Sequence, residues 1–144
     1  MLAVNKYEKT YIETCRRQVD AQLAAYDDMV AARGNESPQK GKRDAAIAAF
    51  ERHFLPHMIL ALDRYFVHRT RALEKKDGNP LNEVRMLCTS ITEGHDTLQA
   101  DSTIKYDPAR SVLKLRIGDE IRLSVDSFRK LSRAFFDDLH EKFG

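Results

Sequence analysis

The stretch HFLPHMILALDRYFVHRTR, residues 53–71, lies inside the longest helical pattern of the chain. The pattern begins at Pro38, since proline suits the first helical position, and continues to Asp77. A straight helix of about 40 residues would be about 60 Å long. A globule of 144 residues is only about 30–35 Å across. Because Pro56 removes a helical hydrogen bond, we expect helix 38–77 to bend or restart near this residue.

Three more helices are predicted from apolar residues that recur every three or four positions. The first, over residues 6–33, is expected antiparallel to the long one and carries a stripe of Val4, Tyr7, Tyr11, Cys15, Val19, Leu23, Tyr26 and Val30. A shorter helix over residues 80–93 begins after the cap residue Asn79. The last, over residues 125–143, begins after Ser124 and has a core stripe of Phe128, Leu131, Phe135, Leu139 and Phe143.

Over residues 103–123 the apolar residues alternate with polar ones. The alternating residues are Ile104, Tyr106, Leu113, Leu115, Ile117, Ile121 and Leu123. Asp107-Pro108 suits a turn, and an odd loop at 118–120 keeps the apolar residues on one face. We therefore predict a three-stranded antiparallel meander, covered by the C-terminal helix. The predicted fold class is α+β, with residues 1–144 forming a single domain.

The composition is typical of a soluble globular protein. Charged residues make up 32% of the chain, but the net charge is only +2, so bulk charge does not indicate nucleic-acid binding. No signal peptide is visible, and no apolar run approaches the roughly 20 residues of a membrane span. Cys15 and Cys88 fall on apolar stripes, which favours buried thiols in a reducing compartment over a disulfide. These features predict a cytoplasmic protein without a membrane anchor.

His53 and His57 have the i, i+4 spacing that lets two imidazoles share a metal ion. No glutamate stands between them, Pro56 distorts the turn, and a third ligand would have to come from His95 or His140. We therefore predict no metal, and expect both histidines to be polar residues that serve backbone carbonyls freed by the proline. A small-ligand or metal site beside Pro56 remains the alternative.

The chain lacks the motifs of common enzyme classes. It has no Glu-x-x-His pair, no Gly-rich phosphate loop and no Gly-x-Ser-x-Gly turn. The segment KKDGNPLNE, residues 75–83, is explained by the end of one helix and the start of the next. The free N–H groups at that helix start are an alternative ligand site. No catalytic residue and no cofactor is predicted, which favours a protein that is not an enzyme.

Two groups of basic residues could bind anions. The first is a stripe on the long helix, formed by Arg64, His68, Arg71 and Lys75. The second is the outward face of the predicted meander, which carries Lys105, Lys114, Arg116 and Arg122. Nucleic acid is a possible partner, but no aromatic residue accompanies the second group. We favour the simpler interpretation, in which the stripe is a solvated helix face and the strand residues prevent edge-to-edge association.

The segments RYFVHRTRALEKKDGNPLNEVRML and SVLKLRIGDEIRLS, with the Phe-rich C-terminal helix, resemble a family of small uncharacterised bacterial proteins of actinobacterial type. The resemblance covers roughly the C-terminal two-thirds of the chain. It implies a cytosolic bacterial protein and assigns no activity, cofactor or site residue.

The helix lengths themselves suggest a function. Two helices of about 28 and 40 residues carry more apolar surface than a short helix and a small sheet can cover, and such surface usually meets a second copy. We therefore expect an interaction module that self-associates through its long helices, most simply as a homodimer. Anion or nucleic-acid binding by the basic residues is the second hypothesis, and a small-ligand or metal site near Pro56 is the third.

Overall fold

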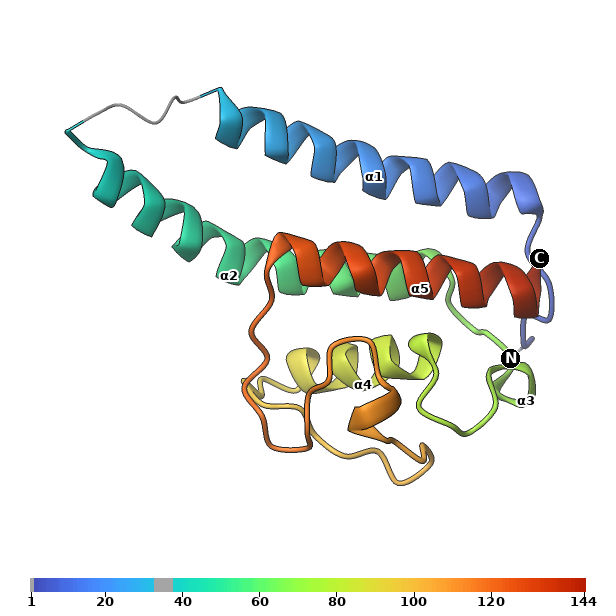
Figure 1. Ribbon diagram of the computed structural model, residues 1–144. Coiled ribbons are helices and arrows are strands. Elements are labelled where there is room, and N and C mark those ends of the chain that lie inside the picture. The colour runs from blue at the N-terminus through green and yellow to red at the C-terminus, as the bar shows by residue number, and fades with distance from the viewer. Residues whose placement is uncertain (1, 33–37) are drawn as a thin grey trace.

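The computed structural model describes residues 2–32 and 38–144. Its helices are α1 (Lys9–Ala31), α2 (Lys40–Tyr65), α3 (Arg71–Glu74), α4 (Pro80–Thr92), the short 3-10 helix η1 (Pro108–Arg110) and α5 (Val125–Phe143), shown in Figure 1. No β-sheet forms within the described residues, which contain only three isolated β-bridges. This part of the chain is therefore all-helical, and the predicted α+β class is wrong.

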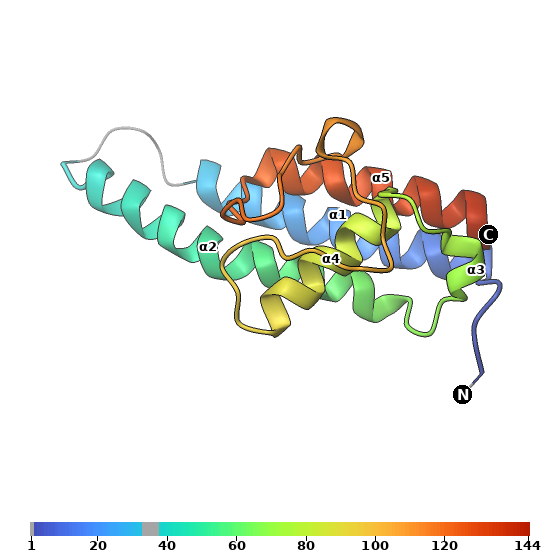
Figure 2. The same ribbon diagram turned by 90° about the horizontal axis from the view of Figure 1, so that it is seen from below.

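The C-terminal helix α5 is the centre of the fold. It packs on α1, α2, α3 and α4, so that α1 lies on one side of it and α4 on the other (Figures 1 and 2). This position follows from its sequence, because apolar side chains cover more than one side of the helix. Its buried apolar residues are Phe128, Leu131, Phe135, Phe136, Leu139 and Phe143. These side chains and the apolar residues of the surrounding helices form one continuous core.

Two tyrosines of α1 reach across to α2. Tyr11 donates to the carbonyl of Tyr65 at 2.7 Å, and Tyr26 donates to Glu51 Oε1 at 2.7 Å. Ile12 is buried beside them, whereas Tyr11, which was expected on the core stripe, is 42% exposed. The hydroxyl explains the difference, since a tyrosine at the edge of a core can bury its ring and keep its polar tip at a partner.

The predicted meander over residues 103–123 is an irregular segment containing η1. Most of its apolar residues contact the core, as the alternation suggested: Ile104 is buried, and Leu113, Leu115, Ile121 and Leu123 are partly buried. Ile117, expected on the same face, is instead 47% exposed. Its backbone, however, does not pair with itself as strands would. Ile121 N donates to the carbonyl of Asp96 at 2.8 Å, and Lys105 N donates to that of Lys76 at 2.6 Å.

Side chains take the place of the missing strand partners. The Glu83 carboxylate, on α4, accepts from Val112 N and from Leu113 N, both at 2.9 Å. Ser111 Oγ accepts from Lys114 N at 2.9 Å, and Asp119 Oδ2 from Arg116 N at 2.8 Å. Because these donors already have acceptors, the segment does not need a second strand to satisfy its backbone.

The helix expected over residues 38–77 ends at Tyr65. The chain then leaves the helical path, and the extended residue Val4 pairs with the following loop. Val4 N donates to the His68 carbonyl at 2.7 Å, and Thr70 N donates to the Val4 carbonyl at 2.9 Å. Within α2 the helix continues through Pro56. In Figure 1 the first half of α2 runs obliquely away from α5, and the second half runs beside it.

Both later helices begin with side-chain caps. Asn79 Oδ1 accepts from Asn82 N at 3.0 Å at the start of α4. Ser124 Oγ accepts from Ser127 N at 3.0 Å, and Ser127 Oγ accepts from Ser124 N at 2.8 Å, which forms a reciprocal capping box at the start of α5. These caps satisfy N–H groups that the first turn leaves unpaired.

Candidate functional site

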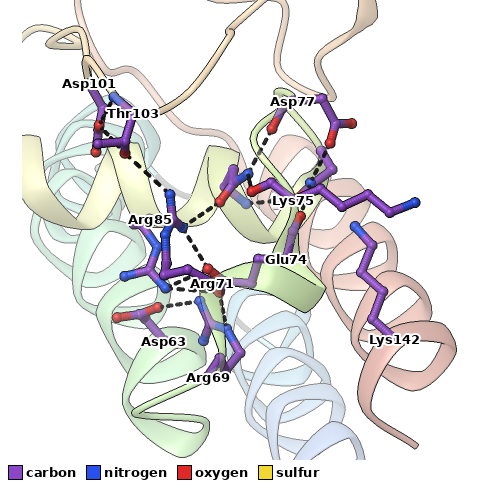
Figure 3. Close-up of polar contacts among 12 residues, drawn as sticks. Asp63, Arg69, Arg71, Glu74, Lys75, Asp77, Arg85, Asp101, Thr103 and Lys142 are labelled. Atoms are coloured by element: carbon purple, nitrogen blue, oxygen red, sulfur yellow. Dashed lines mark hydrogen bonds and ion pairs between the residues drawn. The ribbon is translucent and has the colours of Figure 1, made fainter. Parts of the chain in front are cut away.

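A fully buried carboxylate, that of Glu74 at the end of α3, is surrounded by three arginines (Figure 3). Arg69 Nε donates to its Oε1 at 2.5 Å, and Arg71 Nη1 donates to its Oε2 at 2.6 Å. Arg85 Nη2, from α4, donates to both oxygens at 2.8 and 2.7 Å. We call these four residues the Glu74 cluster. It ties the loop after α2 and the short helix α3 to α4.

Two asparagines hold the backbone beside the cluster. Asn79 Nδ2 donates to the Glu74 carbonyl at 2.6 Å. Asn82 Nδ2 donates to the Asp77 carbonyl at 2.7 Å, and Asn82 Oδ1 accepts from Arg71 Nη1 at 2.8 Å. The turn that they hold contains Lys75 at φ 66° and ψ −168°, a backbone conformation that side chains other than glycine rarely adopt. The polar corner at residues 75–83 is therefore filled by the chain itself.

The charges of the cluster stabilise one another. Burial alone would raise the pKa of Glu74, but the charge and hydrogen bond of Arg69, with further contributions from Arg85 and Arg71, lower that pKa below its ordinary value. Burial alone would likewise lower the pKa of Arg69, and the carboxylates of Glu74 and Asp63 raise it. Arg69 also donates to Asp63 Oδ1 at 3.0 Å, and its guanidinium lies 5.7 Å from the centre of the Phe135 ring. Both buried groups are therefore ionised at neutral pH.

The Glu74 cluster is a structural element, because the arginines direct their donors to groups of the same chain. The sequence analysis missed it. Arg69, Arg71 and Glu74 were assigned to one continuous helix, and Arg85 lies eleven residues further along the chain. One signal was present: Glu74 is the single acid in a segment of bases, RTRALEKK, residues 69–76.

The structure separates the predicted basic stripe. Arg64 lies in the last turn of α2, whereas His68 lies in the following loop with a positive φ of 63°. Arg71 opens α3 and binds Glu74, and Lys75 caps the end of that helix. Only Arg71 is thus committed to the cluster; Arg64, His68 and Lys75 are exposed. The continuous helical stripe is absent because α2 ends before His68.

The second basic group has also lost the geometry expected for it. Lys105, Lys114, Arg116 and Arg122 are all exposed, but no sheet presents them on a common face. Lys114 Nζ donates to the Ala109 carbonyl at 2.5 Å, and Arg122 forms an ion pair with Glu120 at 3.0 Å. Anion binding by these residues remains a prediction, now without a sheet to organise them.

His53 and His57, the two histidines beside Pro56, lie in different surroundings. His57 Nδ1 lies 2.7 Å from the carbonyl oxygen of His53. Because a carbonyl oxygen can only accept, the hydrogen of this bond is carried by Nδ1 of His57, and Nε2 takes no part in it. His57 thus serves a backbone carbonyl near Pro56, but the carbonyl that loses its helical donor at Pro56 is that of Arg52, four residues back, so the expected role of the two histidines stays a prediction. No group of three or more His, Cys, Asp or Glu side chains able to hold a metal occurs within residues 2–32 and 38–144.

The two histidines line separate hollows, each of which is bordered by residues of α2 and α4. One, of about 550 Å³, lies between α2, the end of α4 and residues 120–123, and is lined by His53 and Pro56. The other, of about 530 Å³, lies between the second half of α2 and α4, and is lined by His57. The expected location beside Pro56 thus has a cavity of ligand size, although its lining mixes acids and bases. The acids are Glu51, Asp96 and Glu120, and the bases include Arg52 and Arg122.

Neither cysteine has the surroundings of a nucleophile. Cys15 and Cys88 are both buried and unpaired. Burial raises the pKa of each thiol, so both remain protonated at neutral pH. Among the described residues, none of the helices is long and apolar enough to cross a bilayer.

Comparisons with protein families, with curated proteins and with solved structures found no match for this chain. The resemblance to small bacterial proteins therefore stays a prediction. Function has to be inferred from the geometry of the described residues.

Proposed function

We propose that the protein is a non-enzymatic cytosolic interaction module whose chains pair through the free ends of α1 and α2. These ends, residues 24–32 and 40–52, are named the hairpin tip. The tip extends beyond α4 and α5 in Figure 1. None of residues 40–50 is buried, whereas Leu55, Met58, Ile59 and Leu62 further along α2 are. The exposed half of a long helix is the observation that carries the proposal.

Apolar side chains are exposed on the hairpin tip. Met29 is 56% exposed and Phe50 is 48% exposed. The Phe50 ring stacks on Phe54 with centroids 5.2 Å apart and on Tyr26 at 5.9 Å, so it is held in place rather than free in solvent. A pre-positioned aromatic ring loses little side-chain entropy when a partner covers it, which is why such residues are common at interface centres.

The charges of the tip favour a second copy as the partner. From Gln18 to Ala32 the chain carries the acids Asp20, Asp27 and Asp28 and no base, and α2 opens with Lys40, Lys42 and Arg43. Asp27 pairs with Arg129 at 2.6 Å and Lys40 with Asp44 at 3.0 Å, so the attraction between copies rests mainly on Asp28 and Lys42. Acids near the C-terminus of a helix and bases near the N-terminus are unfavourable for the helix that carries them. A two-fold axis would place the acidic α1 of one copy on the basic α2 of the other, and both contacts would then be attractive.

Light scattering coupled to size-exclusion chromatography tests this proposal. At micromolar concentration we expect a species of twice the chain mass of 16.6 kDa. Met29→Glu combined with Phe50→Glu should convert it to the monomer, because two charges would have to be buried in the interface. A wild-type protein that elutes only as the monomer would refute pairing.

The matched control is Ile117→Glu. Ile117 is 47% exposed, close to the value for Phe50, but it lies in the loop between η1 and α5. This variant should pair as the wild type does, and far-UV circular dichroism should show that all variants keep their helices. A second check is charge reversal: Lys42→Asp should weaken pairing, and adding Asp28→Lys in the same chain should restore part of it.

A further inference from the structure

The groove of about 530 Å³ between the second half of α2 and α4 differs in charge from the hollow beside Pro56. It is lined by Arg64, Arg85 and His57, and by one acid, Asp63. Asp63 forms an ion pair with Arg69 at 3.0 Å, and Arg85 forms one with Glu74 at 2.7 Å. The lining of the groove thus has two arginines and one acid, whereas the hollow beside Pro56 has two arginines and three acids.

Two of the cations have unused donors. Arg64 is exposed and forms no ion pair or hydrogen bond with another described residue. Arg85 uses Nη2 for Glu74, but its Nε is buried and has no hydrogen-bond partner within the described part of the chain. Because this Nε is shielded from solvent, a ligand in the groove would meet the tip of the guanidinium, where Nη1 forms no hydrogen bond within the described residues. Arg85 lines a hollow of ligand size.

The remaining lining supplies polar contacts and an apolar wall. Thr89 and Thr92 lie on the α4 side, and Leu60 and Val67 lie on the α2 side. His57 uses Nδ1 for the carbonyl of His53, which leaves Nε2 as its available nitrogen. Cys88 also lines the groove, but burial keeps its thiol protonated, so nothing here points to covalent chemistry.

We propose that this groove binds a small organic anion, with its carboxylate or phosphate group held by Arg64 and Arg85 and its short apolar body against Leu60 and Val67. Arginine suits this role because its planar guanidinium offers several donors to one anionic group. The Thr89 hydroxyl completes the polar side, whereas Thr92 Oγ1 already donates to the Cys88 carbonyl at 2.6 Å. The site is independent of the hairpin tip, so it can exist whether or not the chains pair.

Titration of the full-length protein with phenyl phosphate, followed by two-dimensional NMR of the backbone amides, tests the site. We expect saturable shifts in the last turns of α2 and in α4. Arg64→Ala should weaken binding by about tenfold or more, since it removes charge-assisted hydrogen bonds. The matched control is Arg52→Ala, because Arg52 is also exposed and on α2 but lines the other hollow. Arg52→Ala should leave phenyl phosphate binding unchanged.

Parallel titrations with benzoate and with inorganic phosphate identify the part of the ligand that matters. Weaker binding of inorganic phosphate than of phenyl phosphate would support the apolar wall, and binding of benzoate would show that a carboxylate suffices. The proposal is overturned if phenyl phosphate causes no saturable shift, or if Arg52→Ala weakens the binding of phenyl phosphate as much as Arg64→Ala does. Equal affinity for inorganic phosphate and phenyl phosphate would overturn the role of Leu60 and Val67.

Discussion

The carboxylate of Glu74 is buried and charged, and the three surrounding arginines stabilise this charge in the protein interior. Replacing Glu74 by glutamine removes one of the two carboxylates that pair with the buried guanidinium of Arg69 and leaves only Asp63. Removing one partner of a buried ion pair destabilises a protein by about 3–5 kcal/mol. We expect Glu74→Gln to lower the free energy of unfolding by an amount in this range, as measured by urea unfolding. Glu93→Gln, at a side chain that is 61% exposed, should change stability by less than about 0.5 kcal/mol. A small effect at Glu74 would contradict the cluster.

The same residue predicts a pH dependence. Because the pKa of Glu74 is lowered in the fold, the folded protein binds this proton less tightly than the unfolded chain does. Its contribution to stability is fully present above the ordinary carboxyl pKa of about 4, and is lost as the pH falls through the lower folded pKa. The stability difference between wild type and Glu74→Gln should therefore be constant near neutral pH and shrink in acid. A difference that grows in acid would contradict the direction of the shift.

Lys75 adopts a conformation that glycine adopts without strain. Its φ of 66° and ψ of −168° place it where a non-glycine residue stores about 1–3 kcal/mol. Lys75→Gly should relieve that strain and raise stability, by about 1 kcal/mol after the added flexibility of the unfolded chain is subtracted. Lys75→Ala removes the same side chain but keeps the strain, so its stability should stay close to that of the wild type. Equal effects of the two changes would indicate that the lysine side chain, and not its backbone, matters.

At the scale of elements, a single carboxylate on α4 decides the form of the segment 103–123. Glu83 accepts from Val112 N and Leu113 N, so Glu83→Ala should expose these two amides. We expect their hydrogen exchange to accelerate strongly while the amides of α5 keep their protection. In a meander these donors would bond to neighbouring strands, and exchange would not depend on Glu83. Unchanged exchange at Val112 and Leu113 would show that Glu83 does not protect these two amides.

The same segment shows where sequence reasoning stops. Helices α1, α4 and α5 were predictable because their signals are local: apolar spacing, the Asn79 cap and the Ser124 cap. The alternation in residues 103–123 marked most of the side chains that touch the core, with Ile117 as an exception, yet alternation alone does not choose between a strand and an irregular segment that packs on a helix. That choice depends on a residue about thirty positions away, Glu83.

The candidate sites also differ in whether a local sequence signal could predict them. The bond from His57 to the His53 carbonyl lies in the region where a polar contact was expected, although the acceptor freed by Pro56 is the carbonyl of Arg52. The Glu74 cluster and the groove at Arg64 and Arg85 were not expected as such, since each requires α2 and α4 to be side by side. Spacing along one helix could not show which arginines are consumed by a buried acid and which remain available.

For the molecule as a whole, α2 should behave as two regions. Its first half, residues 40–50, has no buried residue, while its second half packs on α4 and α5. In dilute protein we expect amides of the first half to exchange much faster than those around Leu62, because local opening there exposes little apolar surface. At concentrations where chains pair, protection of the first half should rise. Equal protection of both halves in a monomer would contradict this division.

The position of α5 has a consequence for synthesis on the ribosome. The first helix packs on the last one, and Tyr7 N donates to the Phe143 carbonyl at 2.7 Å. At about 5–20 residues per second, translation takes several seconds or more to proceed from α1 to α5. During this interval α1 can already contact α2 through Tyr11 and Tyr26, but the part of its apolar stripe that packs on α5 stays uncovered. Emergence of α5 from the ribosome, and not local helix formation, is therefore the event that allows the core to close.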